Sequence, residues 1–358
     1  MNSIGRSLRL SLFGTSHGPA VGCVLEGLPS GLAIDEARIA QEMELRRPHV
    51  GIGTARREAD EVKILSGVMD SRCSGAPLTL VIENRDVDSS AYDQFRRLPR
   101  PGHADMPALA KYSWHDIRGG GQFSGRLTAP LVAAGAVVKS LLEMKGVEIG
   151  AFTRAIGGVE DPEERNVDDA KRSRRHPTRA CNAAINWEIS RLIEAATHAG
   201  DSVGGVVECL VEGLPVGVGE PWFDGLDARL AQWIFSIPAV KGLEFGDGFD
   251  STTALGSENN DPYHWEGGKV RTSRNAHGGV LGGLSSGMPL KMRIAFKPTP
   301  SIGLAQETVD LESGKDSTLQ ITGRHDPCIV PRAVAVVEAV TALALTDLMM
   351  EGGFFESG

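Results

Sequence analysis

The sequence has few aromatic residues, no excess of positive charge and no closely spaced cysteine pair. Aromatic side chains make up 5% of its 358 residues, whereas glycine occurs 44 times, so many tight loops are expected. Its 37 lysine and arginine residues are outnumbered by 46 aspartate and glutamate residues, which gives a net charge of −9. Binding to nucleic acid or to an anionic membrane through bulk charge is therefore not expected.

The five cysteines are odd in number, lie far apart and form no Cys-x-x-Cys motif. This spacing excludes the common zinc and redox motifs, and no metal site is predicted. We expect reduced, buried thiols, as is usual for a cytoplasmic protein. The residues are Cys23, Cys73, Cys181, Cys209 and Cys328.

A long, uninterrupted apolar run is also missing. The first 13 residues lack the apolar core of a signal peptide. The most apolar stretch, residues 333–350, is interrupted by Glu338 and Asp347. This pattern favours a buried helix beginning at Pro331 over a membrane span, and we expect no association with membranes.

Two stretches of the chain resemble each other and suggest two related halves. Residues 21–31 (VGCVLEGLPSG) are echoed by residues 207–217 (VECLVEGLPVG), and each predicts a strand, a Gly-Leu-Pro turn and then a helix. A chance likeness between two common strand–turn–helix units is the alternative. Strand-like runs alternate irregularly with helices, which predicts an α+β fold with mainly antiparallel sheets. We expect one domain over residues 1–358, with pseudo-symmetric halves at about 1–150 and 182–350.

Residues 160–179 are charged and have no apolar period, so a solvated insertion is expected between the halves. Its basic part, residues 171–179, could bind a phosphate-bearing partner, but a plain charged loop is the favoured interpretation.

Three histidines, His17, His103 and His325, lie in short polar loops next to glycine. Glycine lets the backbone come close to a ligand, so each loop can present an imidazole. The loop at residues 118–126 (RGGGQFSGR) adds exposed backbone N–H groups, a hydroxyl and two arginines just before a predicted helix. It is neither a P-loop nor a dinucleotide fingerprint. Together these loops predict an active site that handles anions.

Arginines gather around these loops, and their guanidinium groups bind carboxylate and phosphate in pairs of hydrogen bonds. In an acidic protein this pattern indicates a small polyanionic ligand. Taken in order along the chain, the motifs resemble those of the chorismate synthase family, from about residue 4 to about residue 348. The motifs are GTSHG (14–18), RRP (46–48), VKILSGV (62–68), IEN (82–84), RPGHAD (100–105), RGGGQFSGR (118–126), GDSVGG (200–205), VKG (240–242), GDGF (246–249), KPT (297–299) and GRHDPC (323–328).

The resemblance implies the anti-1,4-elimination of phosphate from 5-enolpyruvylshikimate 3-phosphate to give chorismate, the last common step of the shikimate pathway to aromatic amino acids. It implies a requirement for reduced FMN without net redox change. NADPH would be an indirect source of reducing equivalents, and the sequence does not say how FMN is reduced. The implied fold is a sandwich of antiparallel sheets around a helical layer, assembled as a homotetramer.

By the same resemblance, His17 would protonate the departing phosphate, His103 would protonate the reduced flavin near its N1 edge, and Asp326 would assist in removing the ring proton. His325 is expected to orient its loop. The substrate would be bound by Arg46, Arg57, Arg100, Arg126 and Arg332. Flavin contacts would fall on Gln122, Phe123, Ser124, Pro238, Ala239, Gly282, Lys297, Pro298, Thr299, Pro300, Ser301 and Arg324.

Some positions depart from the family pattern. Thr15 replaces the usual Glu, Pro238 stands where Asn is commoner, and Gln122 stands where relatives often carry Arg or His. None of these changes removes a residue expected to transfer a proton. Two rival interpretations remain: a flavin oxidoreductase that uses NADPH, and a flavin- or anion-binding relative that has lost catalysis.

Overall fold

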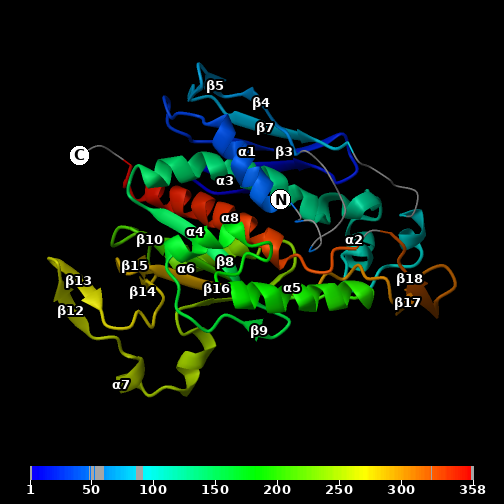
Figure 1. Ribbon diagram of the computed structural model, residues 1–358. Coiled ribbons are helices and arrows are strands. Elements are labelled where there is room, and N and C mark those ends of the chain that lie inside the picture. The colour runs from blue at the N-terminus through cyan, green and yellow to red at the C-terminus, as the bar shows by residue number, and fades with distance from the viewer. Residues whose placement is uncertain are drawn as a thin grey trace.

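The structure is a computed structural model that describes residues 2–47, 49, 52, 60–85, 92–323 and 325–355. Two five-stranded sheets, antiparallel throughout, enclose a layer of helices (Figure 1). The first sheet has the order β1 (Ser3–Ile4), β2 (Arg9–Gly14), β3 (Ala20–Glu26), β7 (Leu78–Glu83) and β4 (Val62–Ser66). The second has the order β11 (Val240–Phe245), β16 (Leu290–Phe296), β10 (Gly205–Glu212), β8 (Glu148–Ile156) and β9 (Val159–Glu160). The predicted α+β sandwich is confirmed.

The helical layer contains α1 (Glu36–Arg46), α3 (Thr128–Glu143), α6 (Leu226–Ile234) and α8 (Val330–Glu351). By length and composition, the segments Gly125–Glu143 and Val330–Glu351 could each cross a membrane, but most of each lies buried inside the protein. They are therefore core helices. A Cβ atom on Gly135 of α3 would lie 2.4 Å from the Cβ of Ala339 on α8, so this glycine permits the close approach of the two helices. The predicted buried helix near Pro331 is confirmed as α8.

The two repeated stretches occupy matching places. β3 and β10 are each the middle strand of their sheet, and each is followed by a helix of the central layer, α1 or α6. Cys23 and Cys209 lie on these two strands, and both thiols are buried and free.

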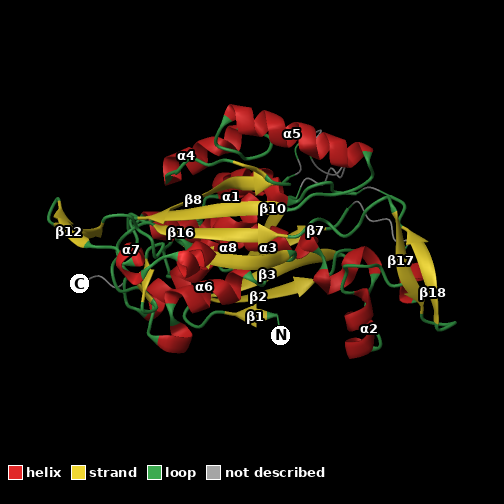
Figure 2. Cartoon of the chain, turned by 90° about the horizontal axis from the view of Figure 1, so that it is seen from below, coloured by secondary structure: helices red, strands yellow, loops and turns green. Residues whose placement is uncertain are grey.

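The helices α4 (Val167–Arg172) and α5 (Ala183–His198) lie beside β8 and β9, along that edge of the second sheet (Figure 2). The prediction of a solvated insertion over 160–179 is wrong, because α4 buries Val167 and Ala170 against β8 and β10. A capping box between Asn166 and Asp169 starts this helix. Six residues are too few to display an apolar period, which explains why the sequence pattern failed here.

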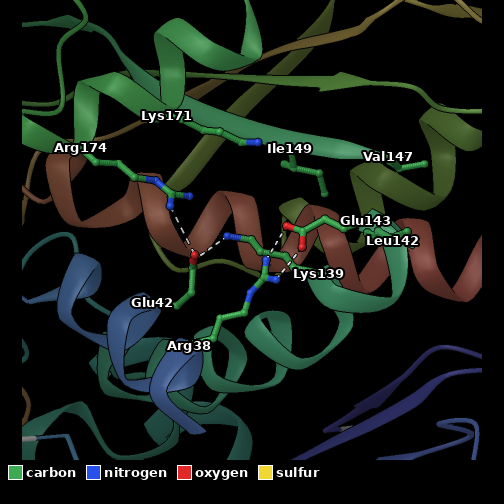
Figure 3. A pocket seen from close by; sticks show the side chains of 9 residues that line it. All are labelled: Arg38, Glu42, Lys139, Leu142, Glu143, Val147, Ile149, Lys171 and Arg174. Carbon is green, nitrogen blue, oxygen red and sulfur yellow. Dashed lines mark hydrogen bonds and ion pairs between the residues drawn. The ribbon is translucent and has the colours of Figure 1, made fainter. Parts of the chain in front are cut away.

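A small hollow of about 50 Å³ between α1, α3, β8 and α4 is lined by charged side chains (Figure 3). Lys139 binds Glu42 at 2.6 Å and Glu338 at 2.7 Å, and all three side chains are buried. Arg174, from the stretch expected to be solvated, also binds Glu338, at 2.6 Å. Burial opposes ionisation of Glu338, but Lys139 and Arg174 hold its pKa below the usual value. Cations and carboxylates therefore satisfy one another here, and the cluster ties the helical layer to the second sheet.

Smaller elements project from the sandwich. They are the hairpins β5–β6 (Val68–Met69, Arg72–Cys73), β12–β13 (Tyr263–Glu266, Lys269–Thr272), β14–β15 (Val280–Leu281, Leu284–Ser285) and β17–β18 (Ala305–Asp310, Lys315–Gln320), the helices α2 (Asp105–Tyr112) and α7 (Gly256–Asn259), and the 3-10 turns η1 (Asp93–Arg96), η2 (Arg118–Phe123), η3 (Gly125–Leu127), η4 (Ser173–Arg175), η5 (Trp222–Asp224) and η6 (Gly248–Thr253). Figure 2 shows α2 and β17–β18 at one end of the sandwich and β12 at the other.

Candidate active site

The loop that carries His17 joins β2 to β3 and rests on the glycine turn η2. The backbone N–H of Ser16 donates to the carbonyl of Gly121 at 3.2 Å. A Cβ atom on Gly119 would lie 2.2 Å from Cδ2 of His17, so only glycine fits under the imidazole. The ring of Tyr92 meets the ring of His17 edge-on at 5.0 Å. His17 is thus buried and held against the predicted anion-binding loop.

The glycine turn has an unusual backbone. Gly119, Gly120 and Gly121 have φ values of 60°, 83° and 55°, a left-handed run that residues with a Cβ rarely adopt. This turn therefore depends on glycine, and the N–H of Gly120 closes it by donating to the carbonyl of Ile117 at 3.0 Å. Gln122 is exposed and Phe123 is 41% exposed at the end of the turn, while the Ser124 hydroxyl caps η3 by accepting from the N–H of Arg126.

Two of the predicted substrate arginines meet at one acid. Arg46 ends α1 and binds Asp60 at 3.0 Å, and Arg126 binds the other oxygen of the same carboxylate. Thr128 also accepts from Nε of Arg46, at 3.0 Å. All four side chains are buried. Arg57, a third predicted substrate arginine, lies outside the described residues.

Asp326 and Arg332 form the next part of the site. Arg332 donates to Oδ2 of Asp326 at 2.7 Å, and its Nε donates to the backbone carbonyl of Arg46 at 3.2 Å. The other oxygen, Oδ1, is buried and has no hydrogen-bond partner among the described residues. Burial raises the pKa of Asp326, although Arg332 pulls it down. This carboxylate is therefore poised to accept a proton. Arg324 lies outside the described residues.

His103 occupies a corner with Lys297 and Arg100. Its Nδ1 lies 3.0 Å from the carbonyl of Pro101, and because a carbonyl only accepts, Nδ1 carries the proton. Lys297 donates to the carbonyl of Gly102 at 2.6 Å. Burial, followed by the charge of Arg100, lowers the pKa of His103 to about 4. The imidazole is consequently neutral near pH 7, with the lone pair of Nε2 free to accept a proton.

Arg100 is already engaged. Its guanidinium binds both oxygens of Asp105, at 2.7 and 2.8 Å, and stacks over the ring of Phe95 at 4.5 Å. One edge of the guanidinium is therefore occupied by Asp105, and one of its faces is covered by the ring of Phe95.

The stretch from Lys297 to Ser301 lines the same corner. The N–H of Lys297 donates to the carbonyl of Ala239 at 3.0 Å, which places Pro238 and Ala239 nearby. The hydroxyl of Thr299 is buried without a hydrogen-bond partner in the described part of the chain. Pro300 packs against Gly102, and Pro298 lies between these contacts along the chain.

His325 uses both ring nitrogens within the protein. Nδ1 lies 3.2 Å from the hydroxyl of Ser301 and Nε2 lies 3.1 Å from the carbonyl of Ile321. This bonding supports the expected role in orienting its loop.

One predicted flavin contact is not brought to this site within the chain. Gly282 lies in the turn of β14–β15, where its neighbour Gly283 packs against Glu220 and Gly225. Figure 1 shows this hairpin on the opposite side of the molecule from α2.

The sequence interpretation also missed several side chains that organise the site. Asp60 was not singled out because its arginine partners are distant in sequence. Asn84 and Asp105 lie inside motifs that were noted, and Tyr92 had no motif to mark it. Among the residues that the structure describes, no group of three or more His, Cys, Asp or Glu side chains is arranged to hold a metal.

Comparison with known proteins agrees along nearly the whole chain. The family model described as chorismate synthase matches residues 8–350. The chain is 48% identical over 349 residues to a chorismate synthase of Korarchaeum cryptofilum (strain OPF8), covering 97% of this chain and 96% of that protein. It is 47% identical over 357 residues to a chorismate synthase of Archaeoglobus fulgidus (strain ATCC 49558 / DSM 4304 / JCM 9628 / NBRC 100126 / VC-16), covering 99% of this chain and 98% of that protein.

A solved structure is similar as well. The crystal structure of a chorismate synthase superimposes with a TM-score of 0.78 at 30% sequence identity, over 98% of this chain and 93% of that one. Fold and sequence therefore agree, and the chain belongs to the chorismate synthase family of lyases.

Proposed function

We propose that this enzyme eliminates phosphate from 5-enolpyruvylshikimate 3-phosphate to form chorismate. The reaction breaks a ring C–H bond and the C–O bond to phosphate, and it forms a new ring double bond. The observation that carries the proposal is the meeting of a buried imidazole, paired arginines and a half-satisfied carboxylate around a left-handed glycine turn. Each of these features matches a need of the reaction: a proton donor, anion binding and a proton acceptor.

The substrate has two carboxylates and a phosphate, so it needs several cations. Arg46, Arg126 and Arg332 are linked through Asp60 and through the backbone of Arg46, which fixes their mutual placement. Arg57 is proposed as a further contact. Arg100 is proposed as a contact too, through the guanidinium N–H groups that Asp105 does not bind.

The residues present fit reduced FMN. The glycine turn with Gln122, Phe123 and Ser124 lies against His17, the buried hydroxyl of Thr299 has no partner among the described residues, and burial lowers the pKa of Lys297. These groups, with Pro238, Ala239, Pro298, Pro300, Ser301 and Arg324, would hold the cofactor. When bound, reduced FMN supplies the electron-rich ring that the elimination requires, with no net redox change.

The proton steps fall to the chain itself. His17 would hold the proton that goes to the departing phosphate, and Oδ1 of Asp326 would receive the proton that leaves the substrate ring. His103 is neutral in the free protein, so it must gain its proton when an anionic ligand arrives. A negative charge near Nε2 would raise its pKa and make this possible.

We also propose a homotetramer in the cytoplasm. Trp222, Phe223 and Phe249 are 86%, 92% and 79% exposed, and Tyr263 and Trp265 of the β12–β13 hairpin are 67% and 77% exposed. An exposed aromatic surface of this kind favours burial against a partner. Gly282, on this side of the molecule, would then reach a flavin only in a neighbouring subunit.

The test is an anaerobic assay of phosphate release with chemically reduced FMN. We expect release, with chorismate as product, only when FMN is reduced. His17→Ala should bind FMN but turn over about 10²- to 10⁴-fold more slowly. Equal turnover with oxidised FMN, or none with reduced FMN, would contradict the proposal; the second result would favour a non-catalytic relative. Net NADPH oxidation in place of phosphate release would favour the oxidoreductase.

A further inference from the structure

Asn84, directly after β7, connects the loop of His17 to an arginine of the site. Its side-chain Nδ2 donates to the carbonyl of Thr15 at 3.0 Å and to the carbonyl of Gly18 at 2.8 Å. Its backbone N–H donates to the carbonyl of Pro19 at 3.1 Å. One residue thus holds the chain on both sides of His17.

The remaining polar atom of the same amide points to Arg126. Nε of Arg126 donates to Oδ1 of Asn84 at 3.0 Å. Arginine can only donate and carbonyls can only accept, so these partners fix which end of the amide is oxygen. Both N–H bonds of the amide and its oxygen therefore have partners, and no other neutral side chain of this length offers the same set.

The two groups that Asn84 joins are expected to act on the same substrate. His17 would protonate the leaving phosphate, while Arg126 would bind one of its anionic groups. A proton donor works only at hydrogen-bonding distance, and a displacement of about 1 Å can reduce a rate about 10²-fold. The separation between His17 and Arg126 is therefore a quantity that the protein has to control.

We propose that Asn84 is a positioning residue, which fixes His17 relative to Arg126 so that the proton donor meets the substrate that the arginine holds. This inference rests on the proposed function. Asn84 itself contacts no reacting atom.

Two substitutions separate the bonds that Asn84 makes to the His17 loop from its bond to Arg126. Asn84→Ala removes the donors to the His17 loop and the acceptor for Arg126. Asn84→Asp keeps an oxygen for Arg126 but sets a second oxygen against the carbonyls of Thr15 and Gly18. Asn186→Ala is the matched control, because the side-chain oxygen of Asn186 also accepts two hydrogen bonds, from the N–H and the hydroxyl of Thr178, and Thr178 is not one of the proposed site residues.

Steady-state assays with reduced FMN should show kcat falling about 10²-fold in both Asn84 variants. KM for the substrate should rise in Asn84→Ala and stay near the wild-type value in Asn84→Asp. The control should lose stability in thermal unfolding with kcat unchanged. An unchanged kcat in both variants, or an equal fall in the control, would overturn the inference.

A second readout needs neither turnover nor flavin. The His17 ring resonances of the ligand-free protein, followed by NMR over a pH titration, should move in both Asn84 variants and not in the control. Unmoved His17 resonances would overturn the inference. If the wild-type protein releases no phosphate, the proposed function fails, and the resonances still decide whether Asn84 holds His17.

Discussion

Arg46 and Arg126 share the two oxygens of a single carboxylate, that of Asp60, in the buried part of the site. Two guanidinium groups that bind the same carboxylate would repel each other if that negative charge were absent. Asp60 has a φ of 46°, a left-handed conformation that Asp and Asn adopt more readily than most residues. Asp60 therefore fixes the distance between Arg46 and Arg126, the two arginines that are proposed to bind the anionic substrate.

Asp60→Asn tests this arrangement while preserving the backbone preference. We expect the free energy of unfolding to fall by about 3–5 kcal/mol, because two buried cations lose their counter-charge. An anionic substrate would replace part of that charge, so adding it should raise the Tm of the variant more than that of the wild type. Thermal unfolding with and without substrate measures both effects.

The control for this substitution is Asp224→Asn. Asp224 binds Arg6 at 2.6 Å, but the two side chains are 32% and 58% exposed, so solvent screens the pair and we expect a much smaller loss of stability. Equal losses in the two variants would mean that Asp60 carries no special electrostatic role.

Asp326→Asn should separate catalysis from stability. The amide cannot accept the substrate proton, so kcat should fall about 10²- to 10⁴-fold. Stability should stay level or rise, because burial already penalises this carboxylate and its Oδ1 has no partner among the described residues. Kinetic assays and urea denaturation measure the two quantities.

Asp105→Asn is the matched comparison. Both oxygens of Asp105 bind Arg100, so its loss should destabilise the protein clearly. If Asp326→Asn destabilised the protein more than Asp105→Asn does, the buried carboxylate of Asp326 could not be a cost to the stability of the protein.

His103 should make stability depend on pH. Its pKa is about 4 in the folded protein, below the ordinary histidine value of 6.5, so the unfolded chain binds its proton more readily between these values. This contribution to stability is complete above pH 6.5 and is lost as the pH falls toward 4, by at most about 3 kcal/mol. Denaturation curves of the wild type and His103→Gln over this range should converge at low pH and diverge near neutrality. Parallel curves would contradict the assignment.

The sequence was sufficient to predict those helices and strands whose own residues show whether they are buried. A helix apolar on every side, as α8 is, must be buried, and Pro331 marks its beginning. The strands β3 and β10 could be recognised because their segments repeat. In contrast, α4 could not be predicted. Its side chains Val167 and Ala170 are buried only because they pack against β8 and β10, which are distant in sequence.

The site divides in the same way. Histidines and glycines beside one another in sequence, such as those of residues 14–18, indicate a functional loop directly. Asp60 and Asn84 act through partners that only folding brings together. A single carboxylate or amide in the sequence does not indicate which residues it will bind. Arg100 stays a predicted substrate ligand, and the sequence could not reveal that Asp105 binds one edge of its guanidinium.

Gln122 gives the last prediction, which concerns FMN. It lies exposed at the end of the left-handed turn, where a basic residue could face the negative charge of reduced FMN. A neutral amide donates hydrogen bonds but adds no Coulombic attraction. We expect Gln122→Arg to tighten FMN binding, by about 0–1 kcal/mol if the site stays open to solvent and by about 1.5–3 kcal/mol if the cofactor shields it. Anaerobic calorimetry at two salt concentrations measures this gain, which should shrink as salt rises because exposed charges are screened. Gln122→Glu serves as the charge-reversed control and should weaken binding. If the arginine variant bound FMN no more tightly than the wild type, the turn would not face the anionic part of the flavin.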